Sequence, residues 1–136
     1  MDCLFCKIAA KEIPSEVVYE DEKIMAFLDI FPTSFGHTLV IPKQHYENVL
    51  DADSDVFGPI LSVVQKIGRA QVDSLGVKGF NVIVNNGKDA GQVIPHLHIH
   101  IIPRREGDGF THWHGPKYES DAQMKEYAEK IRQQIH

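Results

Sequence analysis

Apolar and polar residues follow two different periods along this chain. Short runs in which apolar residues dominate or alternate with polar ones are typical of β-strands. Five such runs predict strands over residues 17–20, 23–30, 37–41, 80–85 and 96–102. Between the third and fourth runs, apolar residues recur at near-helical spacing, which predicts a long helix from Ser54, the candidate N-cap, to about Ser74.

Ser120 and Gln123 form a capping-box pattern that opens a second helix, which runs towards Ile135. Pro103 predicts the end of the last strand, because proline cannot donate to a ladder. The strands do not alternate regularly with helices, as they do in parallel folds. We therefore predict an α+β fold with a five-stranded antiparallel sheet, one long helix and a C-terminal helix. A length of 136 residues without internal repeats predicts one domain over residues 1–136.

Three histidines, His96, His98 and His100, alternate with apolar residues in the last predicted strand. Successive strand side chains point to opposite faces, so the three imidazoles are expected to share one face. The outer two would lie about 13 Å apart along the strand, too far to act on one atom together. A surface strand that happens to carry histidines is the alternative. The polar, glycine-punctuated segment 85–92 favours a binding site, because such loops bring backbone N–H groups up to a ligand.

The two cysteines, Cys3 and Cys6, form a CxxC pair at the start of the sequence. This spacing serves redox pairs and also half of a tetrahedral zinc site. A redox pair usually follows a strand, and no strand is predicted before Cys3. The metal-binding interpretation is therefore favoured, with two free cysteines and no metal as the alternative.

Charge and hydropathy limit the partners. The formal net charge of −5 disfavours nonspecific attraction to nucleic acid, so a mononucleotide fits better than a polymer. We find no apolar run long enough to span a bilayer and no export signal. We therefore expect a cytoplasmic protein without nucleic-acid or membrane partners.

The segment GQVIPHLHIHIIPR, with GHTLVIPKQH and GFNVIVNNG before it, resembles the signature of the histidine-triad (HIT) family of nucleotide-binding hydrolases and transferases. The resemblance covers nearly the whole chain and is closest to the bacterial Hit branch, near the Hint group. It implies a homodimer that cleaves a purine nucleoside phosphoramidate or an adenylylated compound at the α-phosphate and releases the nucleoside monophosphate. A dinucleoside polyphosphate hydrolase, a nucleotidyl transferase and a non-catalytic nucleotide-binding partner protein remain alternatives.

The resemblance also implies a division of roles among the histidines. His98 would attack phosphorus and form a nucleotidyl-histidine intermediate, His100 would hold phosphate oxygens, and His37 would join a proton relay. No metal is needed for that step. His45 and His96 would complete a structural zinc site with Cys3 and Cys6, whereas a catalytic zinc on the histidine face is a third hypothesis.

The family's nucleotide pocket corresponds to an apolar set beside one acid. Asp29 would accept the ribose hydroxyls, and a carboxylate on an otherwise apolar strand needs such a partner. Val93 stands where Hint relatives often carry a serine, and valine cannot donate a hydrogen bond to a leaving amine. The remaining implied positions are the base-pocket residues Leu4, Phe5, Ile8, Phe27 and Ile30 and the phosphate-lining residues Asn85, Gly91 and Gln92.

Overall fold

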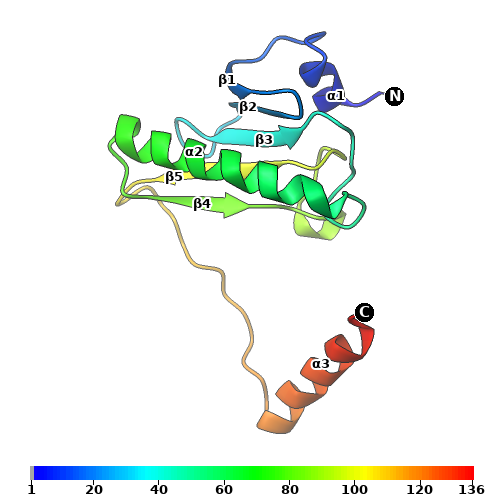
Figure 1. Ribbon diagram of the computed structural model, residues 1–136. Coiled ribbons are helices and arrows are strands. Elements are labelled where there is room, and N and C mark those ends of the chain that lie inside the picture. Colours follow the sequence, from blue (N-terminus) through cyan, green and yellow to red (C-terminus); the bar gives the residue numbers. More distant parts are fainter. Residues whose placement is uncertain (1) are drawn as a thin grey trace.

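The computed structural model describes residues 2–136. One antiparallel sheet forms the centre of the fold (Figure 1). Its strands lie in the order β1-β2-β3-β5-β4, and every neighbouring pair is antiparallel. The α+β fold with five strands is therefore confirmed. The strands are β1 (Val17–Glu20), β2 (Ile24–Leu28), β3 (Thr38–Pro42), β4 (Gly79–Ile83) and β5 (Ile99–Arg104).

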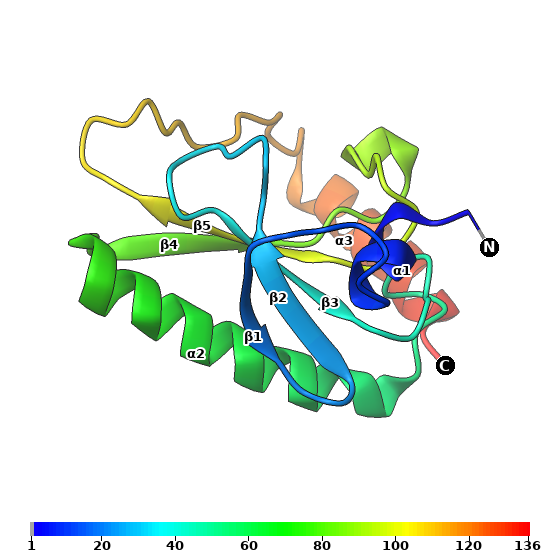
Figure 2. The same cartoon turned by 90° about the horizontal axis from the view of Figure 1, so that it is seen from above.

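The long helix α2 (Phe57–Leu75) packs along one face of the sheet, against β2, β3 and β5 (Figure 2). Its apolar stripe and the inward side chains of these strands form the larger core. The predicted cap is wrong in detail: Ser54 begins a short 3-10 turn, Ser54–Val56, and α2 follows directly from that turn. Leu97, Ile99 and Ile101 are buried in this core, on the face opposite the histidines as predicted.

A short helix, α1 (Leu4–Ala9), covers the other face of β2 and β3. Phe5 and Ile8 pack there against Met25 and Phe27 of β2. Because both faces of β2 are covered, the strand is apolar throughout. The sequence did not predict α1, since six residues are too few to show a helical period.

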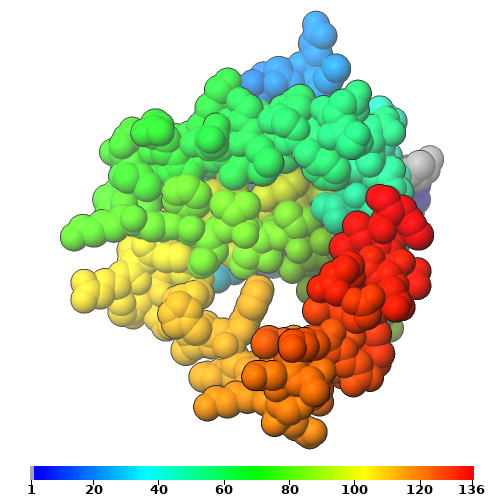
Figure 3. All heavy atoms as spheres, turned by 60° about the horizontal axis from the view of Figure 1, so that its bottom comes forward, coloured from blue at the N-terminus to red at the C-terminus, as the bar shows by residue number. Residues whose placement is uncertain are grey.

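The C-terminal arm, residues 105–136, leads away from the sheet and ends in α3 (Asp121–Gln134). The Ser120 cap is confirmed, because its hydroxyl accepts a hydrogen bond from Gln123 N–H at 3.1 Å. Figure 3 shows that the arm leaves an opening between itself and the body. Within residues 2–136, no helix is long and apolar enough to cross a membrane.

The ends of β2, β3, β4 and β5 differ from the prediction by one to three residues, most of all in β2, β4 and β5. β2 stops at Leu28, because the Asp29 carboxylate accepts a hydrogen bond from Phe31 N–H at 2.8 Å and turns the chain. β5 begins at Ile99 and continues through Pro103 to Arg104. The strand tolerates Pro103 because its pairing with β3 ends at Ile101, and only β4 accompanies β5 beyond that point.

Candidate functional site

A cavity of about 460 Å³ lies between α1, the end of β2 and the 85–94 loop. Its wall is largely apolar, with a few convergent polar groups, which is typical of small-molecule sites. Asp29 is the one carboxylate in the wall, and His98 and His100 lie there as well. The structure thus brings most of the predicted nucleotide-binding residues together, namely Leu4, Phe5, Ile8, Phe27, Asp29, Ile30, Asn85, Gly91, Val93, His98 and His100.

His98 is held in one tautomer. Its Nδ1 lies 2.6 Å from the backbone carbonyl of His96. A carbonyl oxygen only accepts, so Nδ1 carries the proton and the neutral ring keeps a lone pair on Nε2. Phe5 packs edge-on against the ring at a centroid distance of 5.0 Å and fixes its orientation. His98 therefore offers one nitrogen nucleophile to the cavity.

His37 and His100 form a directed chain of hydrogen bonds. Thr33 N–H donates to His37 Nδ1 at 3.0 Å, so the His37 proton sits on Nε2. That nitrogen lies 2.9 Å from His100 Nδ1, which must therefore accept. The proton of neutral His100 then sits on Nε2, which is buried and has no hydrogen-bond partner among residues 2–136. This series of hydrogen bonds therefore ends in a buried donor on His100, a residue that lines the cavity.

Burial keeps these imidazoles neutral. Desolvation lowers the pKa of His37 and of His98 below the ordinary value near 6.5. Burial and the neighbouring His98 and His37 lower the pKa of His100 to about 4. A neutral imidazole with a free lone pair is the form that acts as a nucleophile at neutral pH.

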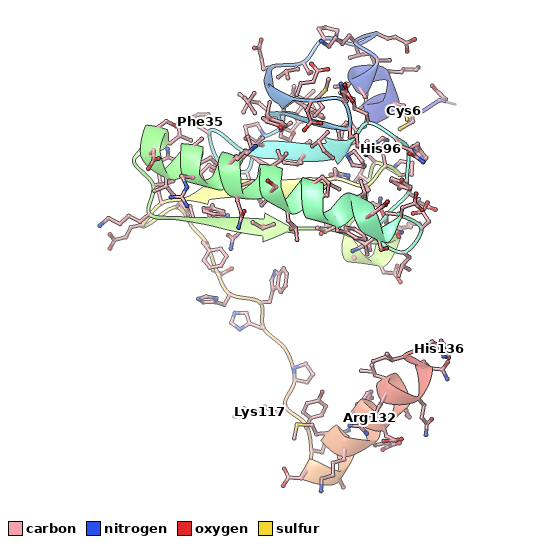
Figure 4. All side chains as sticks on the ribbon, viewed as in Figure 1. Cys6, Phe35, His96, Lys117, Arg132 and His136 are labelled. Atoms are coloured by element: carbon pink, nitrogen blue, oxygen red, sulfur yellow. The ribbon has the colours of Figure 1, made fainter. Side chains whose placement is uncertain are left out.

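A second cluster lies beside the cavity, where α1 meets the segment before β5. It contains Cys3, Cys6, His45 and His96, whose ligand atoms all lie within 4.8 Å of one another. Figure 4 shows Cys6 and His96 at the same end of the molecule. This cluster contains the four residues predicted to bind metal.

The spacing of the cluster fits a tetrahedral zinc ion. With ordinary zinc bond lengths, tetrahedral ligands lie about 3.4 Å apart for two nitrogens and about 3.6 Å apart for nitrogen and sulfur. The Nδ1 atoms of His45 and His96 are 3.2 Å apart. Three of the four nitrogen–sulfur distances, Cys3–His96, Cys6–His45 and Cys6–His96, are 3.3, 3.4 and 3.5 Å. His96 Nε2 lies 2.8 Å from the Pro42 carbonyl and must carry the proton, which leaves Nδ1 as the ligand atom.

Asp29, His37 and His100 also lie close enough together to hold a metal. The hydrogen bonding of His37 argues against this role. Thr33 N–H occupies Nδ1, so a metal on Nε2 would require His37 to lose its last proton. The hypothesis of a catalytic zinc on the histidine face is therefore not favoured.

Comparison with known proteins identifies the relatives of this arrangement. The model of the HIT domain family matches residues 10–107, which include both histidine groups. The chain belongs to the HIT family. Protein hit of Bacillus subtilis is 51% identical over 110 residues, which are 80% of this chain and 76% of the relative. The structure of a B. subtilis HIT family protein has a TM-score of 0.91 and 41% identity, and the match covers 100% of this chain and 99% of that one.

Two HIT relatives have named activities. The adenosine 5'-monophosphoramidase of Schizosaccharomyces pombe is 38% identical over 136 residues, 99% of each chain. The adenylylsulfatase of Arabidopsis thaliana is 48% identical over 107 residues, 79% of this chain and 54% of the relative. The structure of a Zn-bound histidine triad protein from Mycobacterium smegmatis has a TM-score of 0.78 and 35% identity, covering 96% of this chain and 98% of that one. Together these names support nucleotide hydrolysis as the general activity of this HIT protein.

Gln92, which was predicted to line the phosphates, lies outside the cavity wall. Its side-chain amide instead holds the loop together. Its Oε1 accepts from Gly87 N–H at 2.9 Å, and its Nε2 donates to the carbonyls of Glu47 and Ile94. Gly91, at φ 90°, lets the backbone turn beside it.

The sequence analysis also missed part of the cavity wall. Ile13, Pro14 and Ser15 follow α1, and their position depends on how that helix docks. Phe31, Leu39 and Ile94 lie next to predicted site residues in sequence or in the sheet, but apolar residues there gave no signal of their own.

Proposed function

We propose that this HIT protein hydrolyses purine nucleoside phosphoramidates or related adenylylated compounds and releases the nucleoside monophosphate. The observation that carries the proposal is the His98 ring, whose Nδ1–H is held by the His96 carbonyl while the ring lines the cavity. The names of the S. pombe and A. thaliana relatives support the same substrate class.

In the proposed mechanism, the Nε2 lone pair of His98 attacks the α-phosphorus, and a P–N bond forms as the bond to the leaving group breaks. The leaving amine takes a proton from solvent. Water then attacks phosphorus, the P–N bond breaks, and His98 returns with the nucleoside monophosphate released. His100 Nε2–H, unpartnered within the described chain, would donate to a nonbridging oxygen.

Asp29 and the apolar wall would hold the nucleoside. The Asp29 carboxylate would accept the ribose hydroxyls, and its position in the wall beside the apolar residues supports this role. Phe5 and Phe27, 5.5 Å apart between ring centroids, would contact the base.

We propose a structural zinc ion in the cluster of Cys3, Cys6, His45 and His96. The ligand spacing and the Zn-bound M. smegmatis relative support it. The four residues would supply all four ligands from the protein, which is typical of a structural rather than a catalytic zinc. The ion would tie α1 to the segment that carries His98.

We also propose that the protein acts in the cytoplasm as a homodimer. β4 is an edge strand, and Phe80 and Val82 on it are partly exposed, as are Leu61 and Val72 on α2. Joining these surfaces would cover both the apolar residues and the open strand edge. Sedimentation at micromolar concentration should give twice the chain mass, and a monomer at all concentrations would contradict the dimer.

Mass spectrometry of intact protein tests the activity directly. Protein is mixed briefly with adenosine 5'-phosphoramidate and quenched in base, where a phosphorus–histidine bond is preserved better than in acid. Wild type should gain one nucleoside monophosphate, and His98→Ala should not. His114→Ala, an exposed histidine in the arm, is the matched control and should behave as wild type. Nucleotide binding without adduct or product in wild type would instead support a binding protein.

A further inference from the structure

The loop of residues 29–37, between β2 and β3, is folded around the His37 ring. Asp29 N–H donates to the His37 carbonyl at 2.9 Å, and His37 N–H donates to the Ser34 carbonyl at 3.0 Å. The Ser34 hydroxyl donates to the Pro103 carbonyl of β5 at 2.6 Å. The loop is therefore fixed to both β3 and β5, and its backbone has little freedom to move relative to the histidines.

Thr33 places its peptide N–H against the buried side of this ring. The N–H donates to His37 Nδ1 at 3.0 Å, and the His37 side chain is only 3% exposed. No water or side chain is needed to fix the tautomer, because a backbone amide cannot reverse its role as a donor. The Asp29 carboxylate lies 3.7 Å from His37 Nε2, which is too long for a hydrogen bond but favours a proton on that nitrogen.

We propose that the Thr33 peptide N–H is a positioning group that sets the direction of the His37–His100 hydrogen bond. With the proton of His37 on Nε2, His100 Nδ1 accepts, and the buried His100 Nε2–H is left as a donor without a partner among residues 2–136, on a residue that lines the cavity. With the opposite tautomer of His37, His100 would donate from Nδ1 and present a lone pair to the cavity. A lone pair would repel phosphate oxygens, whereas an N–H donor binds them.

The tautomers of His37 and His100 are a property of the protein without substrate. Only the expected effect on kcat rests on the proposed function. The Thr33 side chain takes no part in this hydrogen bond, so mutation can separate the effect of the side chain from the effect of the peptide N–H. Thr33→Ala keeps the peptide N–H, and Thr33→Pro removes it. Thr33 does not line the nucleotide cavity, so neither change alters a proposed substrate contact.

Nitrogen-15 NMR of histidine-labelled protein reads the tautomers directly. In wild type and Thr33→Ala, we expect His37 and His100 both to carry the proton on Nε2. In Thr33→Pro, we expect His37 to lose this single tautomer. With adenosine 5'-phosphoramidate, Thr33→Pro should lower kcat by roughly tenfold or more with little change in KM, and Thr33→Ala should stay within about twofold of wild type.

The proposal is overturned by a wild-type spectrum with the His37 proton on Nδ1, whether or not Thr33→Pro folds. It is also overturned by a folded Thr33→Pro protein that keeps both tautomers and full kcat. Predicted tautomers in a wild-type protein that does not hydrolyse the phosphoramidate would support the positioning role while contradicting the proposed hydrolase.

Discussion

Zinc binding by the Cys3, Cys6, His45 and His96 cluster should release two protons at pH 7.5. A metal-bound cysteine is a thiolate, whereas burial and the hydrogen bond to Cys3 raise the pKa of the Cys6 thiol to about 11 in the metal-free protein. Free thiols are mostly protonated at neutral pH, so each cysteine ligand must lose one proton. His96 adds almost none, since burial lowers its pKa and keeps it neutral.

Two released protons give the apparent zinc affinity a steep dependence on pH. Between pH 7 and 8, affinity should rise about 100-fold, which corresponds to about 2.7 kcal/mol. Redox pairing of the cysteines or a site built from histidines alone would give no such slope.

Calorimetry in two buffers of different ionisation enthalpy counts the protons. Metal-free protein, prepared with a chelator and kept reduced, is titrated with zinc at pH 7.5. Wild type should release about two protons, and Cys6→Ser about one with much weaker binding. His114→Ala should match wild type. Release of fewer than one proton by wild type would refute the assignment of both cysteines as ligands.

Three further changes test other parts of the structure. Asp29→Asn should raise KM for the phosphoramidate roughly tenfold in steady-state assays, because a charged hydrogen bond to the ribose is weakened, and an unchanged KM would place the ribose elsewhere. A Cβ on Gly68 would lie 2.4–2.9 Å from the Phe80 ring, so Gly68→Ala should lower the unfolding free energy in urea by about 1 kcal/mol despite the better helix propensity of alanine. In a Phe80→Ala background the sign of this change should reverse. Because the folded-state pKa of His100 is lowered to about 4, the unfolded chain binds its proton first as pH falls below about 6.5, and stability should decrease from there towards pH 4. His100→Asn should flatten this acid limb in thermal scans, and an unaltered limb would contradict the low pKa.

The sequence predicted those features that depend on side-chain alternation. The histidines before and in β5 lie opposite Leu97 and Ile99 because a period of two is a property of any extended segment. The CxxC pair was recognisable from its spacing, and the isolated acid at Asp29 because a carboxylate is costly to bury without a partner.

Features that depend on tertiary contacts could not be predicted in the same way. α1 is too short to be stable alone and is held by the packing of Phe5 and Ile8 on the sheet. Gln92 is a plausible phosphate ligand by residue type, yet its amide is used to close a loop. The Thr33 group that faces His37 is a backbone N–H, which every residue except proline carries and no sequence pattern marks.

His96 belongs to two assemblies at once, since its ring faces the cysteines while its carbonyl holds His98. If zinc and nucleotide bind as proposed, His96 would couple them, and their coupling free energy would be the same in both directions. If zinc strengthens nucleotide binding by a given factor, nucleotide strengthens zinc binding by that factor. When zinc is scarce, the protein molecules that hold nucleotide would then keep their zinc longest. The concentration of each ligand would change the apparent affinity of the protein for the other.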